Sequence, residues 1–271
     1  NTKTVTYNGE EQSVEGYTVT GNPANADVTL VGKAVATGTD ADTYPMGLTA
    51  ADFTATSPNY DKVTVEVTDG YLEINPITDK VTVTVTEKSD TVTYNGQEHS
   101  VTGYKSMTAD NALYDVKKNV AETSTEAWTA KGKYVGTYHV GIKAADFKNT
   151  SGNFTNVEFV IVDGTLKIDP VSDKVTVTIT ENADTVIYDT TGHSVTGYES
   201  MTADNALYDV TKNVAETKTA AWTAKGTEAG EYPVGIVSGD FANTSKNFTN
   251  VVFTVADGAL TISPISEKTI T

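Results

Sequence analysis

The chain has no cysteine and no arginine, and only seven of its 271 residues are leucine. The absence of cysteine excludes disulfide bonds, thiol catalysis and thiolate metal sites, so apolar burial alone must stabilise any core. No run of about 18 apolar residues occurs, and we therefore expect no membrane-spanning segment. The first residues lack the charged and apolar segments of a signal peptide, so we expect a fragment of a longer protein.

Positive charge is also scarce. The chain carries 19 lysines against 36 acidic residues, which gives a formal net charge of −17. Such a charge repels the phosphates of nucleic acids and of anionic lipids, and it keeps copies of the chain apart. We expect a soluble monomer that binds no nucleic acid.

Threonine and valine dominate what is present. There are 48 threonines, and the segments V-T-V-T-V at 81–85 and V-T-V-T-I at 175–179 alternate apolar and polar residues. A period of two residues is typical of β-strands rather than helices. The sequence therefore predicts an all-β fold.

The chain repeats itself. One closing phrase occurs three times at a spacing of 94 residues: YLEINPITDK (71–80), TLKIDPVSDK (165–174) and ALTISPISEK (259–268). Proline ends a strand in each phrase, so we place three repeats at 1–80, 81–174 and 175–271. The linkers are short and contain no glycine, which favours stiff connections and a rod-like array.

Repeats 2 and 3 share a segment that repeat 1 lacks. The eleven residues SMTADNALYDV occur at both 106–116 and 200–210, whereas the corresponding stretch of repeat 1 is seven residues shorter and also lacks the tryptophan. Because about two-thirds of the positions match between repeats 2 and 3, we interpret this segment as framework plus an exposed loop.

Turn residues predict hairpins in each repeat. Asp69-Gly70, Asp163-Gly164 and Asp257-Gly258 each separate two apolar-alternating runs, which predicts two-residue hairpins that pair Val67 with Leu72 and its counterparts. Asn8-Gly9 and Asn95-Gly96 predict type I′ hairpins near the start of repeats 1 and 2, while repeat 3 has Gly192 two residues later.

About seven or eight short strands per repeat are expected, the size of an immunoglobulin-like β-sandwich. A helix is considered only near Ala121–Thr129. The predicted architecture is thus three tandem immunoglobulin-like β-sandwich modules arranged end to end.

Several motifs carry a resemblance to a known family. These are Tyr-Asn-Gly near the start, G-x-Y at 136–138 and 230–232, A-A-D-F at 144–147, N-F-T-N-V at 153–157 and D-G-x-L-x-I-x-P. The chain resembles the immunoglobulin-like tandem modules, termed MBG-type, of giant bacterial surface proteins. The resemblance implies a secreted, cell-wall-attached adhesin whose repeats hold a distal binding domain away from the cell.

Little in the sequence supports catalysis. The only histidines are His99, His139 and His193, and no Ser, His and Asp set recurs between repeats. One or two histidines per repeat are too few for a metal cage, and no Asp-rich calcium loop is present. We expect no enzyme activity, no catalytic residues, no cofactor and no metal site.

Trp128 and Trp222 are the remaining candidate ligand-binding residues. An exposed tryptophan would stack on a sugar, whereas a tryptophan in a strand such as A-W-T-A more often packs in the core with its indole N–H paired. The sequence therefore favours structural stalk repeats whose partners are the neighbouring repeats of the same chain. The alternative is a module that binds host glycans or mucins.

Overall fold

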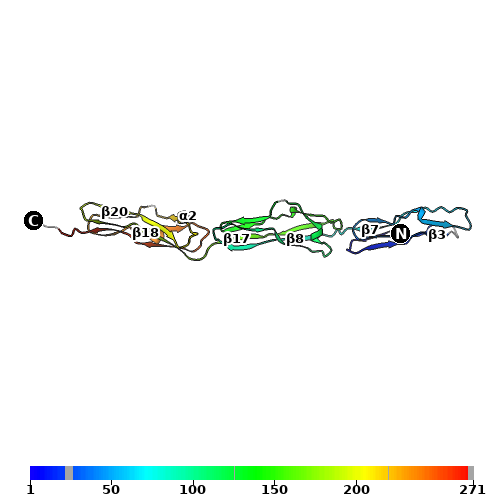
Figure 1. Cartoon of the computed structure of the whole chain (residues 1–271), viewed down its shortest axis with the longest axis horizontal. Coiled ribbons are helices and arrows are strands. Elements are labelled where there is room, and N and C mark those ends of the chain that lie inside the picture. The colour runs from blue at the N-terminus through cyan, green and yellow to red at the C-terminus, as the bar shows by residue number, and fades with distance from the viewer. Residues whose placement is uncertain (22–26, 125, 219, 268–271) are drawn as a thin grey trace. The chain divides into compact units, whose positions relative to one another are not determined.

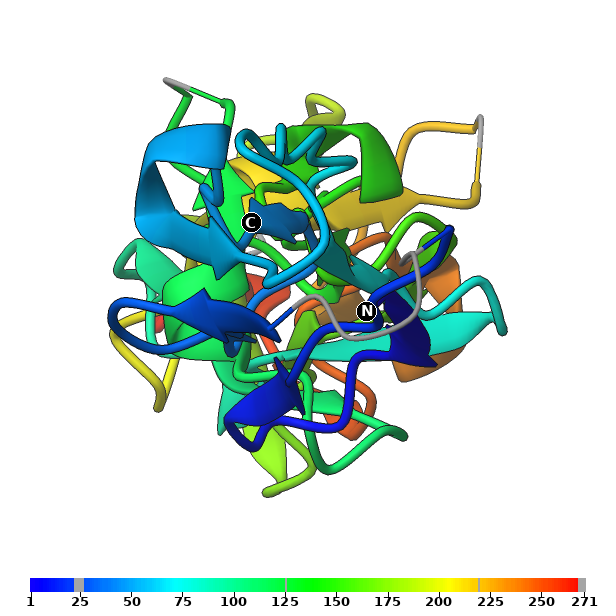
Figure 2. The same ribbon diagram turned by 90° about the vertical axis from the view of Figure 1, so that its right-hand side faces the viewer.

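The computed structural model describes residues 1–21, 27–124, 126–218 and 220–267. Nearly every element in it is a β-strand, as Figures 1 and 2 show from two directions. Among the described residues, the only α-helices are the single turns α1 (Val116–Asn119) and α2 (Val210–Asn213). The predicted all-β class is confirmed.

The chain divides into two compact units. Unit 1 comprises Asn1–Lys88, Thr102–Trp128 and Gly141–Gly164, and unit 2 comprises Ser89–Val101, Thr129–Val140 and Thr165–Thr271. Repeat 2 is shared between them, so each unit contains one whole linker. The three-repeat division stays a prediction, because its boundaries lie inside these units.

Unit 1 contains the sheets β1-β7-β5, β2-β4, β3-β6, β11-β8-β16 and β12-β15. Their strands are β1 (Lys3–Thr6), β2 (Gln12–Glu15), β3 (Asp27–Leu30), β4 (Val35–Gly38), β5 (Thr43–Pro45), β6 (Phe53–Thr56), β7 (Tyr71–Asn75), β8 (Val81–Glu87), β11 (Tyr104–Ala109), β12 (Val120–Glu122), β15 (Phe147–Asn149) and β16 (Val157–Val162).

Unit 2 contains the sheets β10-β13, β14-β17-β9, β21-β18-β26, β19-β27-β24, β20-β23 and β22-β25. Their strands are β9 (Asp90–Thr93), β10 (His99–Thr102), β13 (Thr129–Gly132), β14 (Gly136–His139), β17 (Thr165–Asp169), β18 (Val175–Glu181), β19 (Asp184–Ile187), β20 (His193–Thr196), β21 (Tyr198–Ala203), β22 (Val214–Glu216), β23 (Thr223–Gly226), β24 (Gly230–Pro233), β25 (Phe241–Asn243), β26 (Val251–Ala256) and β27 (Ala259–Ser263).

The valine and threonine alternation sets the centre of two sheets. Along β8, Val81, Val83 and Val85 are fully buried, while the threonines between them are half-buried. Strand β8 runs antiparallel to β11 on one side and parallel to β16 on the other, and β18 has the same arrangement between β21 and β26. The predicted strands at 81–85 and 175–179 are confirmed.

The predicted Asp-Gly hairpins are wrong. Strand β16 lies in the sheet of β8, whereas β17, which follows Asp163-Gly164, pairs with β9 and β14 in another sheet. The chain crosses between sheets at this point, and Gly164 is required because a Cβ there would collide with the backbone of Lys88. The same crossing occurs at Gly258, whose added Cβ would meet Asn182.

The predicted Asn-Gly hairpins are also wrong, because β1 pairs with β7 and β2 with β4. The turns themselves exist: Gly9 and Gly96 have φ of +80° and +76°, and the Asn95 side chain accepts a hydrogen bond from Gln97 N. A type I′ turn needs positive φ at both central residues, and Asn95 does not have it. In repeat 3 the position of Gly96 is occupied by Thr190, at φ 70°.

Two smaller expectations also differ from the structure. The described residues of 121–129 contain no helix. Helix α1 begins after its cap Asp115, which accepts from Lys117 N, and it ends before Val120, whose backbone is extended; Ala121 lies on strand β12. The described residues of the range 81–169 form ten strands, β8–β17, instead of seven or eight. The additional strands belong to short pairs such as β12 with β15.

Candidate functional site

The two tryptophans occupy packed positions. Trp222 is 7% exposed and Trp128 is half-buried. Their indole N–H groups donate to Asp240 Oδ2 at 2.7 Å and to Asp146 Oδ2 at 2.9 Å. The pKa of Asp240 lies below its ordinary value because its carboxylate accepts a hydrogen bond from the Val237 backbone and another from the indole. These contacts support the structural interpretation of the tryptophans.

Neighbouring rings cover part of each indole. Phe241 stacks on Trp222 and Phe147 lies against Trp128, both with ring centroids 5.6 Å apart. Lys218 Nζ lies 5.9 Å from the Trp222 ring centroid, in cation–π range. Repeat 2 has Ser124 at the position of Lys218, so no lysine from this position lies near the Trp128 ring. Trp128 is therefore the better residue on which to test sugar binding. Sugar binding itself stays a prediction.

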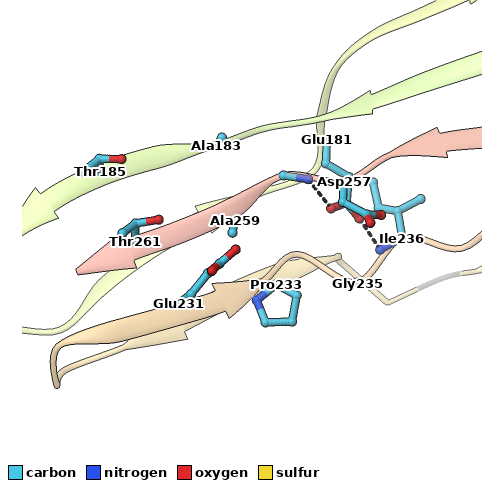
Figure 3. A pocket seen from close by; sticks show the side chains of 11 residues that line it. Glu181, Ala183, Thr185, Glu231, Pro233, Gly235, Ile236, Asp257, Ala259 and Thr261 are labelled. Atoms are coloured by element: carbon cyan, nitrogen blue, oxygen red, sulfur yellow. Dashed lines mark hydrogen bonds between the residues drawn. The ribbon is translucent and has the colours of Figure 1, made fainter. Parts of the chain in front are cut away.

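A hollow of about 430 Å³ lies over the sheet β19-β27-β24 in unit 2. Figure 3 shows Thr185, Glu231 and Thr261 along the strands that form its floor. Glu181 and Asp257 lie at one end. The polar groups of this hollow are therefore hydroxyls and carboxylates, and none of the three histidines lines it.

The Glu181 carboxylate is buried, and both of its oxygens are engaged by backbone N–H groups. Its side chain is 4% exposed, and its two oxygens accept hydrogen bonds from Ile236 N at 2.5 Å and Gly258 N at 2.8 Å (Figure 3). Glu87 makes the equivalent bonds to Ile142 N and Gly164 N, both at 2.6 Å. Each carboxylate thus satisfies two backbone N–H groups where the chain crosses between sheets.

Two of the three histidines contact turn residues, whereas His139 is the last residue of strand β14. His99 Nε2 lies 2.9 Å from Asn95 Oδ1, and His193 Nε2 lies 2.9 Å from Asp189 Oδ1. The pKa of Asp189 is lowered to about 2, mainly by hydrogen bonds from the Thr191 side chain and backbone, and further by His193. Among the residues that the structure describes, no three His, Cys, Asp or Glu side chains gather as metal ligands would.

The most conspicuous constellation lies where repeat 1 meets repeat 2, inside unit 1. We call it junction A and define it by Tyr7, Asn153, Phe154, Leu113 and Tyr114. The Phe154 ring is 2% exposed and lies edge-to-face between Tyr7 of repeat 1, at 5.7 Å, and Tyr114 of repeat 2, at 5.1 Å. A ring from one repeat is therefore part of the core at the end of the next.

Polar contacts accompany the rings of junction A. Asn153 Oδ1 accepts a hydrogen bond from Ala41 N at 2.6 Å, and Asn153 Nδ2 donates to Asp40 Oδ1 at 2.9 Å. The linker residue Ile77 donates its N–H to Asn153 O and accepts from Thr155 N. The linker is thus held to the following repeat by backbone hydrogen bonds.

Unit 2 contains the same arrangement where repeat 2 meets repeat 3. Junction B consists of Tyr94, Asn247, Phe248, Leu207 and Tyr208. Phe248 lies edge-to-face with Tyr94 at 5.7 Å and with Tyr208 at 5.1 Å, and Asn247 Oδ1 accepts from Val135 N at 3.0 Å. Val171 takes the place of Ile77 in the linker, with the same two backbone bonds.

The shared eleven-residue segment contributes to both junctions. Leu113 lies so close to the turn of repeat 1 that a Cβ on Gly9 would be 3.1 Å from its Cδ2, and Leu207 stands in the same relation to Gly96. Tyr114 and Tyr208, each 4% exposed, donate their hydroxyls to Asn149 and Asn243. Asp110, in the same segment, accepts a hydrogen bond from Thr82 N at 2.9 Å. These contacts support the interpretation of the segment as part of the structural framework.

The contact between the Tyr-Asn-Gly and N-F-T-N-V motifs is not predicted by the sequence patterns above, although the rings of both motifs meet at each junction. The available signal was the constant spacing of the phenylalanines from the linker, because Phe154 follows Ile77 at the same distance as Phe248 follows Val171. None of the helices in the described part of the chain has the length and apolar character that a membrane span needs. No family model matches the chain, and no curated protein matches it.

Proposed function

We propose that the chain consists of structural stalk repeats of a secreted bacterial surface adhesin, without enzymatic activity. In this proposal the repeats are attached to the cell wall through the full-length protein and hold a distal binding domain away from the cell. The neighbouring repeat is each repeat's main partner.

The observation that carries the proposal is the junction that occurs twice. Junctions A and B use the same residue types at matching positions: a tyrosine and a glycine turn from one repeat, and a leucine, an asparagine and a phenylalanine from the next. A buried aromatic ring and a side-chain-to-backbone hydrogen bond both resist rotation between neighbours. Reuse of one junction is what an array needs if every step must keep the same geometry.

The charge of the chain and the packed tryptophans are consistent with this role. A net charge of −17 disfavours self-association. The most buried polar side chains, Glu87 and Glu181, are engaged by backbone N–H groups of their own fold. Secretion, the bacterial surface and cell-wall attachment follow from the resemblance to MBG-type modules and are part of the proposal.

A glycan and mucin binding screen with the isolated chain tests the proposal against the adhesive alternative. We expect no reproducible binding. Trp128→Ala and Trp128→Phe serve as matched variants, because the phenylalanine keeps a ring against Phe147. Binding by the parent chain that Trp128→Ala abolishes, at unchanged circular dichroism, would replace the stalk proposal with a lectin-like function.

A further inference from the structure

A groove of about 420 Å³ opens along repeat 1, inside unit 1. Residues 17–21 line one side and residues 63–68 the other, and residues 17–20 and 63–68 belong to no strand in the described chain. Tyr17 and Val19 are 36% and 42% exposed. Apolar side chains thus line a slot between two extended segments that are not joined to each other as a sheet.

The counterparts of these two segments in repeats 2 and 3 do belong to sheets. Residues 63–68 correspond to β16 and β26, and the segment from Tyr17 corresponds to the start of β11 and β21. In both later repeats a central strand, β8 or β18, lies between them and pairs with each. The groove of repeat 1 therefore lies where repeats 2 and 3 have their fully buried central strand.

A backbone hydrogen bond gives the register of repeat 1 against repeats 2 and 3. Asn1 N donates to Gly16 O at 3.2 Å, as Lys88 N does to Gly103 O at 3.1 Å and Asn182 N to Gly197 O at 3.0 Å. Lys88 directly follows β8, which ends at Glu87. Asn1 is therefore in register with the first residue after a central strand.

The chemistry of the groove matches one kind of segment. Val63, Val65 and Val67 are half-buried, while the residues between them are exposed, so the apolar side chains alternate as those of β16 do against β8. At the Asn1 end, Leu48 N donates to Asp69 Oδ1, whereas the counterpart Ile142 N donates to Glu87. The groove thus suits valines along its length, and Asp69 takes in repeat 1 the N–H that Glu87 accepts in repeat 2. Both central strands, β8 and β18, nevertheless end in glutamate.

We propose that this groove is a strand-accepting site. It binds an extended segment of seven residues, the length of β8, with Val or Ile at the first, third and fifth positions, Thr between them and Glu at the last. By analogy with β8, the segment runs antiparallel to residues 17–20 and parallel to residues 63–68. With it, repeat 1 gains the three-stranded sheet that repeats 2 and 3 have.

The test is to add V-T-V-T-V-T-E, the sequence of Val81–Glu87, before Asn1. The matched control adds T-V-T-V-T-V-E, which has the same composition but places the valines on the opposite face of the strand. Hydrogen exchange is measured in peptides that cover residues 13–21 and 61–70, with peptides from β8 and β16 as the internal reference.

We expect the added segment to slow exchange at residues 17–20 and 63–68 by about tenfold or more, because new backbone hydrogen bonds must open before exchange. The control segment should leave these rates unchanged. Unaltered rates with both segments, or equal slowing with both, would overturn the proposal.

Discussion

At the scale of single residues, the turn of repeat 3 has a threonine with positive φ where the turns of repeats 1 and 2 have glycine. Gly9 and Gly96 have positive φ, and the third turn places Thr190 in the same region at φ 70°. A β-branched side chain is disfavoured there, since its Cβ crowds the following carbonyl. Asp189 and Thr191 on either side hold the turn through the Asp189 carboxylate, which accepts from the Thr191 backbone and hydroxyl.

Thr190→Gly is expected to raise the free energy of unfolding of repeat 3 by about 0.5–1 kcal/mol, because relief of the left-handed strain exceeds the added entropy of the unfolded chain. Chemical denaturation of the variant and the parent chain measures the change. Gly96→Thr is the reciprocal variant, and we expect it to destabilise repeat 2, since its side chain would also meet Leu207. Equal stability of Thr190→Gly and the parent would show that the turn is not strained.

Asp189 gives the same turn a pH dependence. Because its pKa is lowered to about 2 in the folded chain, from an ordinary value of 3.8, its stabilising contribution is present above about pH 4 and is lost as the pH falls toward 2. We expect Asp189→Asn to destabilise repeat 3 at pH 6 and to have a smaller effect at pH 2. An effect of the same size at both pH values would contradict the assignment.

At the scale of elements, local sequence patterns identified strands better than their partners. The alternation of valine and threonine predicted β8 and β18 correctly, since burial on one face dictates that pattern. Asp163-Gly164 predicted a hairpin, but Gly164 N donates to Glu87 Oε2, 77 positions away. No local pattern reveals that partner, and the parallel pairing of β8 with β16 is equally non-local.

The junctions were missed for the same physical reason. Their rings come from a turn, a loop and the eleven-residue segment, which lie far apart in the sequence and meet only when the linker is hydrogen-bonded. What the sequence does show is the closing phrase that recurs at a fixed spacing and the absence of glycine after its proline. The placement of both tryptophans in packed, hydrogen-bonded positions was also accessible, because strand tryptophans usually pack in this way.

The buried glutamates that join two sheets should be sensitive to small changes. We expect Glu181→Gln to lower the free energy of unfolding of repeat 3 by about 1–3 kcal/mol, because one of its two backbone N–H groups then faces an amide N–H₂. Glu231→Gln is the control, since Glu231 lines the same hollow but is exposed, and it should change stability by less than about 0.5 kcal/mol. Similar losses of unfolding free energy in both variants would show that the Glu181 hydrogen bonds stabilise the repeat no more than an exposed glutamate does.

A double-mutant cycle between Tyr7 and Phe154 tests junction A directly. We expect the two alanine substitutions to be coupled by about 0.5–1.5 kcal/mol, the value typical of edge-to-face aromatic pairs. Tyr17 supplies the control, because its ring packs on Phe53 instead, at 5.2 Å, and Tyr17→Ala should be additive with Phe154→Ala. The stability of the chain is followed by denaturant unfolding. Additive effects of Tyr7→Ala and Phe154→Ala would mean that the two rings contribute no coupling energy across the junction.

At the scale of the whole molecule, the account rests on the junctions. Each linker is bonded to the repeat that follows it, and each turn of the preceding repeat is covered by a leucine and a phenylalanine. Junctions of this kind should limit bending, and the net charge of −17 should oppose folding back of one repeat on another. Screening within about 10 Å at 0.1 M salt weakens the second effect, so stiffness should depend mostly on the contacts.

Small-angle X-ray scattering of the whole chain tests this central claim most directly. Size scaling gives a radius of gyration of about 18 Å for one compact globule of this length, and about 31 Å for three modules of about 90 residues spaced roughly 35 Å apart in line. We predict a radius of gyration of roughly 28–33 Å that scarcely changes between low and high salt. A value near 20 Å, on the same scaling, would show repeats packed side by side and would contradict the stalk.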